Sequence, residues 1–300
     1  MRIFVFQNKC PLFIFMAGLL LSTLLSCKEK HYPSPPGYDL EKPNRMALGK
    51  ALNEISGITF YKDINNTLFA ISDSKEKIFQ INVSSKKIKD KAEKFAGPHD
   101  FEDVVLVDTT IFVLVSNGTI MAVPLDLVHD VTDSSRTITY PFWDGGVNDF
   151  ETLYYDPSAN GLIMVCKDCE SDKGKKVRSA YRFDLALRKF DSSVFYTLSS
   201  DKVKELAKDD NADFRPSAAA IHPIDKQLYM LSSAGQLLII ADTRGTVKSV
   251  YHINPKINPQ AEGIAFAPDG TMFISNEGKF GKPTLQVLPY KINKDQTKTK

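Results

Sequence analysis

The stretch that decides the fold is Gln260-Ala261-Glu262-Gly263-Ile264-Ala265-Phe266-Ala267-Pro268-Asp269-Gly270-Thr271-Met272-Phe273-Ile274. Two polar residues, Gln260 and Glu262, stand two positions apart and open a short apolar segment. A turn marked by Pro268, Asp269 and Gly270 follows, and a second apolar segment comes after it. Short apolar runs bounded by such turn residues predict two β-strands joined as a hairpin.

The same phrase occurs four more times along the chain. The other copies are Glu54-Ile55-Ser56-Gly57-Ile58, Asp100-Phe101-Glu102, Asp149-Phe150-Glu151 and Arg215-Pro216-Ser217. Their second polar positions, together with Glu262, are spaced by 46, 49, 66 and 45 residues. Blades of β-propellers are about 40–50 residues long and contain four strands each. The spacing therefore predicts an all-β protein, a single β-propeller of four-stranded blades, with five blades favoured and six as the alternative.

Two irregularities refine this prediction. The spacing of 66 residues, from Glu151 to Ser217, is longer than the others. It contains residues 198–207, whose pattern predicts a short helix, capped by Ser or Asp and inserted between blades. The last repeat has only three evident strands, at about 263–266, 272–275 and 285–290. Because an open sheet edge exposes unpaired backbone groups, we expect an N-terminal strand within residues 46–52 to close the ring.

The N-terminus has the pattern of an export signal. A basic start, Met1-Arg2, precedes an apolar run from residue 11 to residue 25, which ends in Leu24-Leu25-Ser26-Cys27. This ending resembles the lipobox of bacterial lipoproteins, in which cleavage before the cysteine leaves it as the lipidated N-terminus. We therefore predict a signal peptide over residues 1–26 and lipidation of Cys27. The alternatives are an ordinary cleaved signal and an N-terminal membrane helix.

The predicted lipoprotein has a location and a domain layout. Lys28, rather than Asp, follows the cysteine, and by resemblance to Gram-negative sorting patterns this favours the outer membrane, facing the periplasm or the cell surface. Residues 27–44 are rich in proline and predict an extended tether. The propeller is expected over residues 45–291, followed by a Lys-rich flexible tail over 292–300.

Composition excludes some partners. The chain has 300 residues, 43% hydrophobic and 25% charged, with a formal net charge of +2. Because no dense basic stripe with interleaved aromatic residues is present, nucleic acid is not an expected partner. The expected partners are the membrane, through the lipid anchor, and an unidentified small ligand or protein.

The polar positions of the repeats define the candidate site. Residues two apart on a strand share a face, so these side chains are predicted to converge on one mouth of the central channel, joined by residues that end the second strands. The predicted binding residues are Glu54, Ser56, Asp73, Asp100, Glu102, Asp149, Glu151, Lys167, Arg215, Ser217, Glu262 and Glu277.

Crowded carboxylates repel one another and need a cation, protons or basic partners. Oxygen ligands suit calcium, so one hypothesis is a calcium site with Glu102, Glu151 and Glu262 as ligands. A second is that the carboxylates cap the inner strands and pair with Lys167 or Arg215. A third is direct catalytic use; we assign no catalytic residue, and whether the protein is an enzyme is left open.

Cys166 and Cys169 form a CxxC motif. In an exported protein a disulfide is the expected state, with free thiols and redox chemistry or metal binding as the alternatives. His222, followed by Pro223, is interpreted as a turn residue. Trp143 is interpreted as packing between blades.

The lipobox and the repeat phrases together resemble the SdiA-regulated family of β-propeller lipoproteins, over roughly residues 45–290. In the two middle copies, Asp103 and Thr152 stand where that pattern has glycine. The resemblance implies a link to phytase-like propellers and to calcium-responsive physiology. Two functions follow as hypotheses: a binding module with an acidic channel mouth, or a metal-dependent phosphoesterase. Since a phosphatase needs several cationic side chains around phosphate, the scarcity of Lys and Arg at the mouth favours binding.

Overall fold

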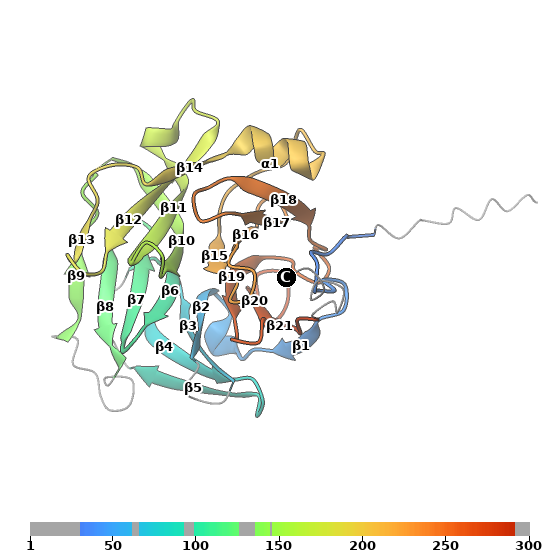
Figure 1. Cartoon of the computed structure of the whole chain (residues 1–300). Coiled ribbons are helices and arrows are strands. Elements are labelled where there is room, and N and C mark those ends of the chain that lie inside the picture. The colour runs from blue at the N-terminus through green and yellow to red at the C-terminus, as the bar shows by residue number, and fades with distance from the viewer. Residues whose placement is uncertain (1–30, 62–65, 93–98, 126–135, 145, 292–300) are drawn as a thin grey trace, which may run out of the picture. The chain divides into compact units, whose positions relative to one another are not determined.

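The computed structural model describes residues 31–61, 66–92, 99–125, 136–144 and 146–291. Five antiparallel sheets surround a central channel (Figure 1). Blade I contains β2 (Ile55–Tyr61), β3 (Thr67–Ser72), β4 (Lys75–Asn82) and β5 (Lys87–Ala92). Blade II contains β6 (Phe101–Val107), β7 (Thr110–Val115), β8 (Ile120–Pro124) and β9 (Ile138–Tyr140).

The other three blades follow in chain order. Blade III contains β10 (Asn148–Asp156), β11 (Gly161–Cys169), β12 (Val177–Asp184), β13 (Lys189–Phe190) and β14 (Tyr196–Ser199). Blade IV contains β15 (Ala218–Ile221), β16 (Leu228–Ser232), β17 (Leu237–Ala241) and β18 (Val247–His252). Blade V contains β19 (Ala261–Phe266), β20 (Met272–Asn276), β21 (Thr284–Leu288) and β1 (Asn44–Ala47).

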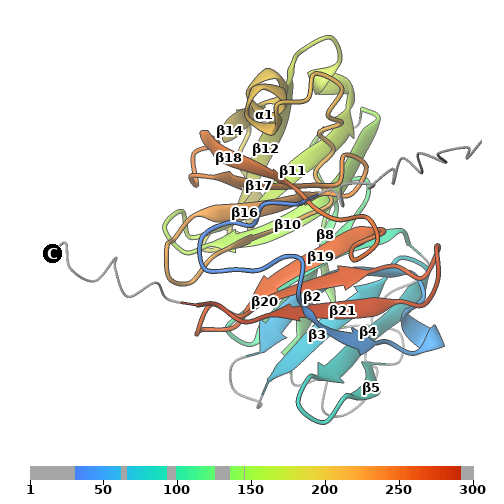
Figure 2. The same ribbon diagram turned by 90° about the vertical axis from the view of Figure 1, so that its right-hand side faces the viewer.

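The ring is closed by the N-terminal strand, as predicted. β1 pairs antiparallel with β21, with Met46 opposite Leu285, and the two strands lie side by side in Figure 2. The strand is shorter and earlier than the predicted segment, because Lys50–Leu52 forms a 3-10 helix instead. The fold is therefore a five-bladed β-propeller, and the six-bladed alternative is wrong.

The long step between repeats holds extra structure in blade III. β13 and β14 both pair with β12, so this sheet has a fifth strand. The predicted helix follows as α1 (Ser200–Ala207), and its N-cap Ser199 accepts a hydrogen bond from the Lys202 backbone N–H. Val203 and Ala207 are buried, which anchors the helix beside the blade.

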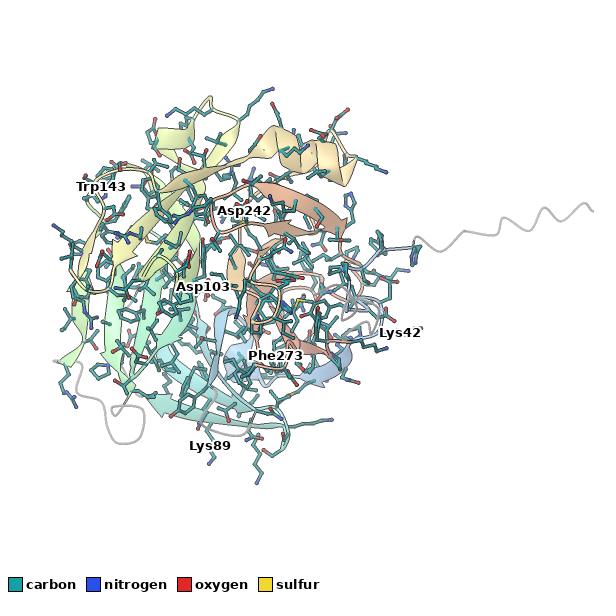
Figure 3. The ribbon with its side chains drawn as sticks, in the orientation of Figure 1. Lys42, Lys89, Asp103, Trp143, Asp242 and Phe273 are labelled. Carbon is teal, nitrogen blue, oxygen red and sulfur yellow. A yellow bond between two sulfur atoms is a disulfide. The ribbon has the colours of Figure 1, made fainter. Side chains whose placement is uncertain are left out.

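The hydrophobic core lies between blades. Five clusters of buried side chains each combine residues of two neighbouring sheets, including blades V and I. Phe60 of blade I stacks on Phe273 of blade V, with ring centroids 5.8 Å apart; Figure 3 labels Phe273. Since the interface that closes the ring resembles the other four, no blade is left as an exposed end.

The segment before β1 packs against the propeller. Tyr38 and Leu40 are 8% and 2% exposed and belong to the cluster between blades IV and V. The Tyr38 hydroxyl donates to the carbonyl of Gly270, 2.5 Å away. The packed domain therefore begins before the predicted boundary at residue 45, and the tether is shorter than residues 27–44.

Other predicted segments lie outside the described residues. These are the signal peptide, the lipidated Cys27 and the tail over residues 292–300. Within the described part of the chain, no helix is both long enough and apolar enough to cross a membrane.

The inner strands of neighbouring blades meet where each strand begins. A Cβ atom on Gly57 would lie 2.6 Å from the Cα atom of Asp103, so glycine is required there for close approach. The Asp103 carboxylate, labelled in Figure 3, accepts hydrogen bonds from the backbone N–H groups of Val104 and Leu153, both at 2.8 Å. Asp103 thus joins blade II to blade III at a position where blades I and V have glycine.

We predict that Asp103→Ala destabilises the fold without touching the channel. The substitution leaves two buried N–H groups without an acceptor, which should lower the free energy of unfolding by about 3 kcal/mol and the melting temperature by about 6–12 °C. Asp168→Ala, which removes an exposed carboxylate of β11, is the control and should change stability by less than about 0.5 kcal/mol. Equal melting temperatures for the two variants would contradict the bridging role of Asp103.

Candidate functional site

The inner strands carry β-bulges at the repeated polar positions. The strand register shifts between Phe101 and Asp103, so Glu102 is the extra residue. Equivalent shifts occur in β2, β10 and β19, where Glu151 and Glu262 are the extra residues of the last two. Bulges re-aim a side chain and are common beside functional sites.

A small cavity of about 120 Å³ lies at this end of the channel. We call its lining the acidic mouth; it consists of Ser56, Asp73, Glu102, Glu151, Ser217, Gln260, Glu262 and Glu277. All five second positions of the repeat contribute to it. Residues that end the second strands, Asp73 and Glu277, complete it.

The first polar positions are placed differently, and among them only Gln260 lines the cavity. Glu54 accepts a hydrogen bond from the Ser74 hydroxyl. Asp149 forms an ion pair with Lys167 at 3.2 Å, and Arg215 pairs with Asp213 at 3.1 Å. Asp100 lies outside β6 and close enough to Glu102 to influence its ionisation. These predicted residues therefore surround the acidic mouth rather than line it.

Lys167 is the main counter-charge of the site. It contacts both Glu151 and Asp149. Burial is the largest single effect and opposes its charge, but the hydrogen bonds and charges of Glu151 and Asp149 together outweigh burial and raise the pKa of Lys167. The pKa of Glu151 is also raised, which disfavours its charged form. Burial, with the charges of Asp149 and Asp100, outweighs the lowering effect of Lys167.

The remaining carboxylates are poorly compensated. Burial, followed by the charges of Glu151 and Asp100, raises the pKa of Glu102 to about 9. Burial and the charges of Glu151 and Glu277 raise the pKa of Glu262 to about 8. Burial and the charge of Asp73 raise the pKa of Glu277 to about 7, despite the opposing effect of Lys279. Close to neutral pH these groups therefore hold protons that an unfolded chain would release.

Two oxygen atoms of the acidic mouth lack a donor. Asp73 Oδ1 and Gln260 Oε1 are buried and have no hydrogen-bond partner among the described residues. The atoms of the acidic mouth that could bind a metal are carboxylate, amide and hydroxyl oxygens, and such ligands fit a hard cation. In the described ranges, however, no three His, Cys, Asp or Glu side chains are close enough to hold a metal as they stand. Cation binding would thus require the carboxylates to move together.

A second cavity of about 420 Å³ adjoins the acidic mouth and shares Glu151, Gln260 and Glu262 with it. Lys167 and Arg215 line this cavity, as do Lys279 and Phe280 from the loop between β20 and β21. Sequence reasoning missed this loop. The available signal was Lys279, which follows the predicted Glu277 by two positions.

Other residues considered from the sequence lie outside the mouth. A disulfide joins Cys166 and Cys169 at the end of β11. His222 is fully buried among aromatic rings, and its Nδ1 accepts from the Asp225 backbone N–H. Trp143, at the edge of the molecule in Figure 3, is 51% exposed. It follows the last strand of blade II, its ring contacts Tyr181 of blade III, and its indole N–H donates to the Asp191 carbonyl. It therefore packs between blades, as interpreted from the sequence, although it is not buried.

The fold and the site define a five-bladed β-propeller with an acidic cluster at the end of the channel where the inner strands begin. The sequence model of the SdiA-regulated family matches residues 34–280, most of the chain. The chain therefore belongs to the SdiA-regulated family. A search of curated proteins found no significant match.

The chain is similar to solved structures at low sequence identity. The PQQ-bound form of aldose sugar dehydrogenase from Streptomyces coelicolor is 11% identical, with a TM-score of 0.55, covering 86% of this chain and 100% of that one. A luciferin-regenerating enzyme is 11% identical, with a TM-score of 0.48 over 83% of this chain and 95% of that one. Virginiamycin B lyase from Staphylococcus aureus is 11% identical, with a TM-score of 0.42 over 79% and 67%. Likeness at this level concerns architecture alone.

The raised pKa values predict a pH dependence of stability. Between the unfolded value of about 4.5 and the folded values of about 7 to 9, the folded chain binds more protons. The contribution of these groups to the free energy of unfolding must therefore fall as pH rises through this window. In calcium-free buffer, Glu102→Gln and Glu262→Gln should each raise the melting temperature at pH 8.5 by about 5 °C, corresponding to about 1–2 kcal/mol, with little effect at pH 4.5.

The matched control for this measurement is Glu205→Gln, on an exposed position of α1. Its melting temperature should follow that of the wild type at every pH. A wild-type pH profile in the two channel variants would show that these carboxyl groups ionise freely.

Proposed function

We propose that this protein is a non-enzymatic binding module, anchored to the outer membrane by a lipid on Cys27, whose acidic mouth binds a cation. The single observation that carries the cation proposal is a group of oxygen atoms in one cavity whose charges and hydrogen-bonding capacity are not satisfied by the protein. Carboxylates with raised pKa values share a cavity with two buried oxygen atoms that lack hydrogen-bond donors. A bound cation would satisfy both features at once.

Calcium is the first candidate for this cation. The lining offers only oxygen donors, and calcium accepts six to eight oxygens in flexible geometry. Glu102, Glu151 and Glu262 come from three different blades, so an ion between them would draw the inner strands together. Asp73 and Glu277 are the additional oxygen donors nearest the same cavity.

The cationic side chains favour binding over phosphoester hydrolysis. A phosphate group needs positive charges that are free to contact it, whereas Lys167 and Arg215 already pair with carboxylates. Two basic residues of the β11–β12 connection are engaged as well: Lys173 pairs with Glu170, and Lys176 pairs with Asp201. A hydrolase of this type would therefore begin with several of its phosphate-binding groups occupied.

Calcium is expected to stabilise the wild-type protein by mass action. At a hundredfold excess over its dissociation constant the gain is about 2.7 kcal/mol, or a rise of about 5–10 °C in melting temperature. The rise should be larger at pH 8.5 than at pH 6, because calcium competes with protons for Glu102 and Glu262. The double substitution Glu102→Gln with Glu151→Gln should abolish it.

The control double variant is Glu170→Gln with Glu205→Gln, which changes charge equally at exposed positions. It should retain the calcium effect. A calcium effect that survives in the channel variant, or is absent from the wild type, argues that the acidic mouth is not the calcium site.

Anchoring is tested separately. Cys27→Ser should leave the full chain unprocessed or release it from the outer-membrane fraction, since acyl chains on that cysteine hold the protein at the bilayer. Cys10→Ser, a change within the predicted signal peptide, should leave membrane fractionation unchanged. A Cys27→Ser protein that is processed and fractionates like the wild type would refute the anchor.

A further inference from the structure

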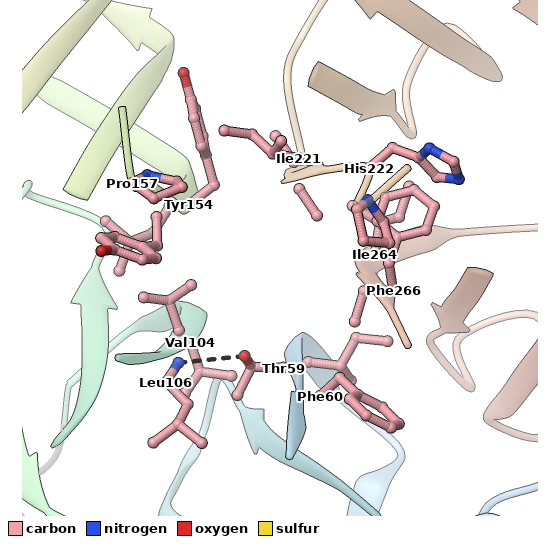
Figure 4. Close-up of a pocket in the computed structure, with 18 of the residues that line it drawn as sticks. Thr59, Phe60, Val104, Leu106, Tyr154, Pro157, Ile221, His222, Ile264 and Phe266 are labelled. Carbon is pink, nitrogen blue, oxygen red and sulfur yellow. Dashed lines mark hydrogen bonds between the residues drawn. The ribbon is translucent and has the colours of Figure 1, made fainter. Parts of the chain in front are cut away.

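The channel has a second mouth with different chemistry. A cavity of about 320 Å³ lies where the inner strands end. At the equivalent position near the end of its inner strand, each blade contributes a large side chain to it, namely Phe60, Leu106, Tyr155, Ile221 and Phe266. Figure 4 shows Phe60, Leu106, Ile221 and Phe266 around the open space. We call these five residues the apolar mouth.

The cavity extends from the ends of the inner strands into the ring. Val104, Leu153 and Ile264 line its inner part; they are 1–3% exposed and belong to the clusters between blades. The residues of the apolar mouth are only partly buried. A neighbouring cavity of about 370 Å³ shares Phe60, Leu106, Tyr155 and Phe266. The space therefore begins at the surface and ends inside the ring, and its size is that of small-molecule sites, about 300–1,000 Å³.

Small side chains create the room. Ala219 and Ala220 of β15, together with Ala265 of β19, line the cavity. Blades IV and V therefore present methyl groups where blades I to III present Thr59, Val105 and Tyr154. Ala220 is only partly buried and packs at the edge of the cluster between blades IV and V, so a larger residue there would occupy part of the space.

The charge at the rim is positive. Lys226 is the only Lys or Arg among the described residues that line the 320 Å³ cavity, and no Asp or Glu lines it there. Its amine donates to the carbonyl of Pro223 at 2.6 Å, which leaves its charge uncompensated by a carboxylate among the described residues. Asp108 is the acidic residue among those that line the neighbouring cavity. Asp225, which precedes Lys226 in the chain, accepts a hydrogen bond from the Tyr229 hydroxyl at 2.9 Å.

We propose that the apolar mouth binds a free long-chain fatty acid. The alkyl chain would lie among the five apolar side chains, and the carboxylate would pair with Lys226. One narrow cavity surrounded by five strands admits a single chain, which favours a fatty acid over a lipid with two chains. The apolar lining provides the attraction, and the single cation provides selectivity for an anionic head.

The N-terminal segment packs at the same end of the channel, and this makes the membrane the source of the ligand in this proposal. Tyr38 contacts Gly270, in the turn that follows Phe266 of the apolar mouth. Only eleven positions separate Tyr38 from Cys27, a reach of about 40 Å at most. An anchored chain therefore keeps this end of the channel near a bilayer. This last step rests on the proposed anchoring, whereas the cavity and Lys226 do not.

The test uses full-length protein in isolated membranes and a palmitic acid carrying a photoreactive diazirine and a terminal alkyne. After irradiation, the label on the protein is quantified and mapped by mass spectrometry. We expect labelled peptides to contain Phe60, Leu106 or Tyr155, and excess untagged palmitic acid to remove the label. Ala220→Phe should reduce labelling at least fivefold by filling the cavity.

Matched variants separate the cavity from the surface. Ala234→Phe places the same ring in the same blade at the opposite end of the channel and should label like the wild type. Lys226→Gln should lower labelling about fivefold, the size of a partly exposed ion pair, and should not affect labelling by the matching fatty alcohol probe. Melting temperatures establish that each variant is folded.

Three outcomes would overturn the proposal. The first is labelling that does not change in Ala220→Phe. The second is equal loss of label in Ala220→Phe and Ala234→Phe. The third is displacement of the label by phosphatidylethanolamine vesicles as effectively as by untagged palmitic acid, which would assign the cavity to a membrane lipid. Because Cys27→Ser protein should still be labelled when the probe is supplied directly, failure of the anchor and failure of this site are distinguishable.

Discussion

The fold depends on the close approach of five inner strands around one axis. Neighbouring inner strands meet so tightly at their beginnings that Gly57 faces the backbone of Asp103, and Gly263 faces the carbonyl oxygen of Ser56. Backbone hydrogen bonds cross between blades at the same level, for example from Phe101 N–H to the Asp73 carbonyl. A bulge at this level has backbone on both sides, so the side chain of its extra residue projects into the channel.

This geometry explains the direction of the polar side chains but not their charge. Ser56 and Ser217 occupy two of the five equivalent positions, and both are buried without ionisable groups. Neutral residues therefore satisfy the fold at this level. Burial raises the pKa of the glutamates at the other three positions, and the charge of Glu151 raises those of Glu102 and Glu262 further. These groups therefore oppose folding above neutral pH. The architecture therefore does not require these charges, and this is one ground for the proposal that the acidic mouth binds a cation.

The sequence predicted the architecture because each blade repeats one hydrophobic pattern, and the missing strand of the last repeat pointed to closure by β1. It also placed Glu102, Glu151 and Glu262 together. The rule that residues two apart share a face failed for Glu54, because a bulge inserts one residue between the first position and the regular strand. The apolar mouth was not foreseen, since Phe60 and Tyr155 at strand ends look like ordinary core residues. The space of a cavity is set by side chains from all five blades together, and the pattern of a single repeat does not show it.

The cavities at the two ends of the channel share no lining residue. Between them, the side chains of Val104, Leu153 and Ile264 are buried in the clusters between blades. Each inner strand nevertheless carries residues of both ends: on β6, Glu102 and Leu106 are four positions apart, about 13 Å along an extended strand. A cation could therefore influence the apolar mouth only by shifting these strands. Such coupling would be reciprocal, because a coupling free energy between two sites changes the affinity of both by the same factor.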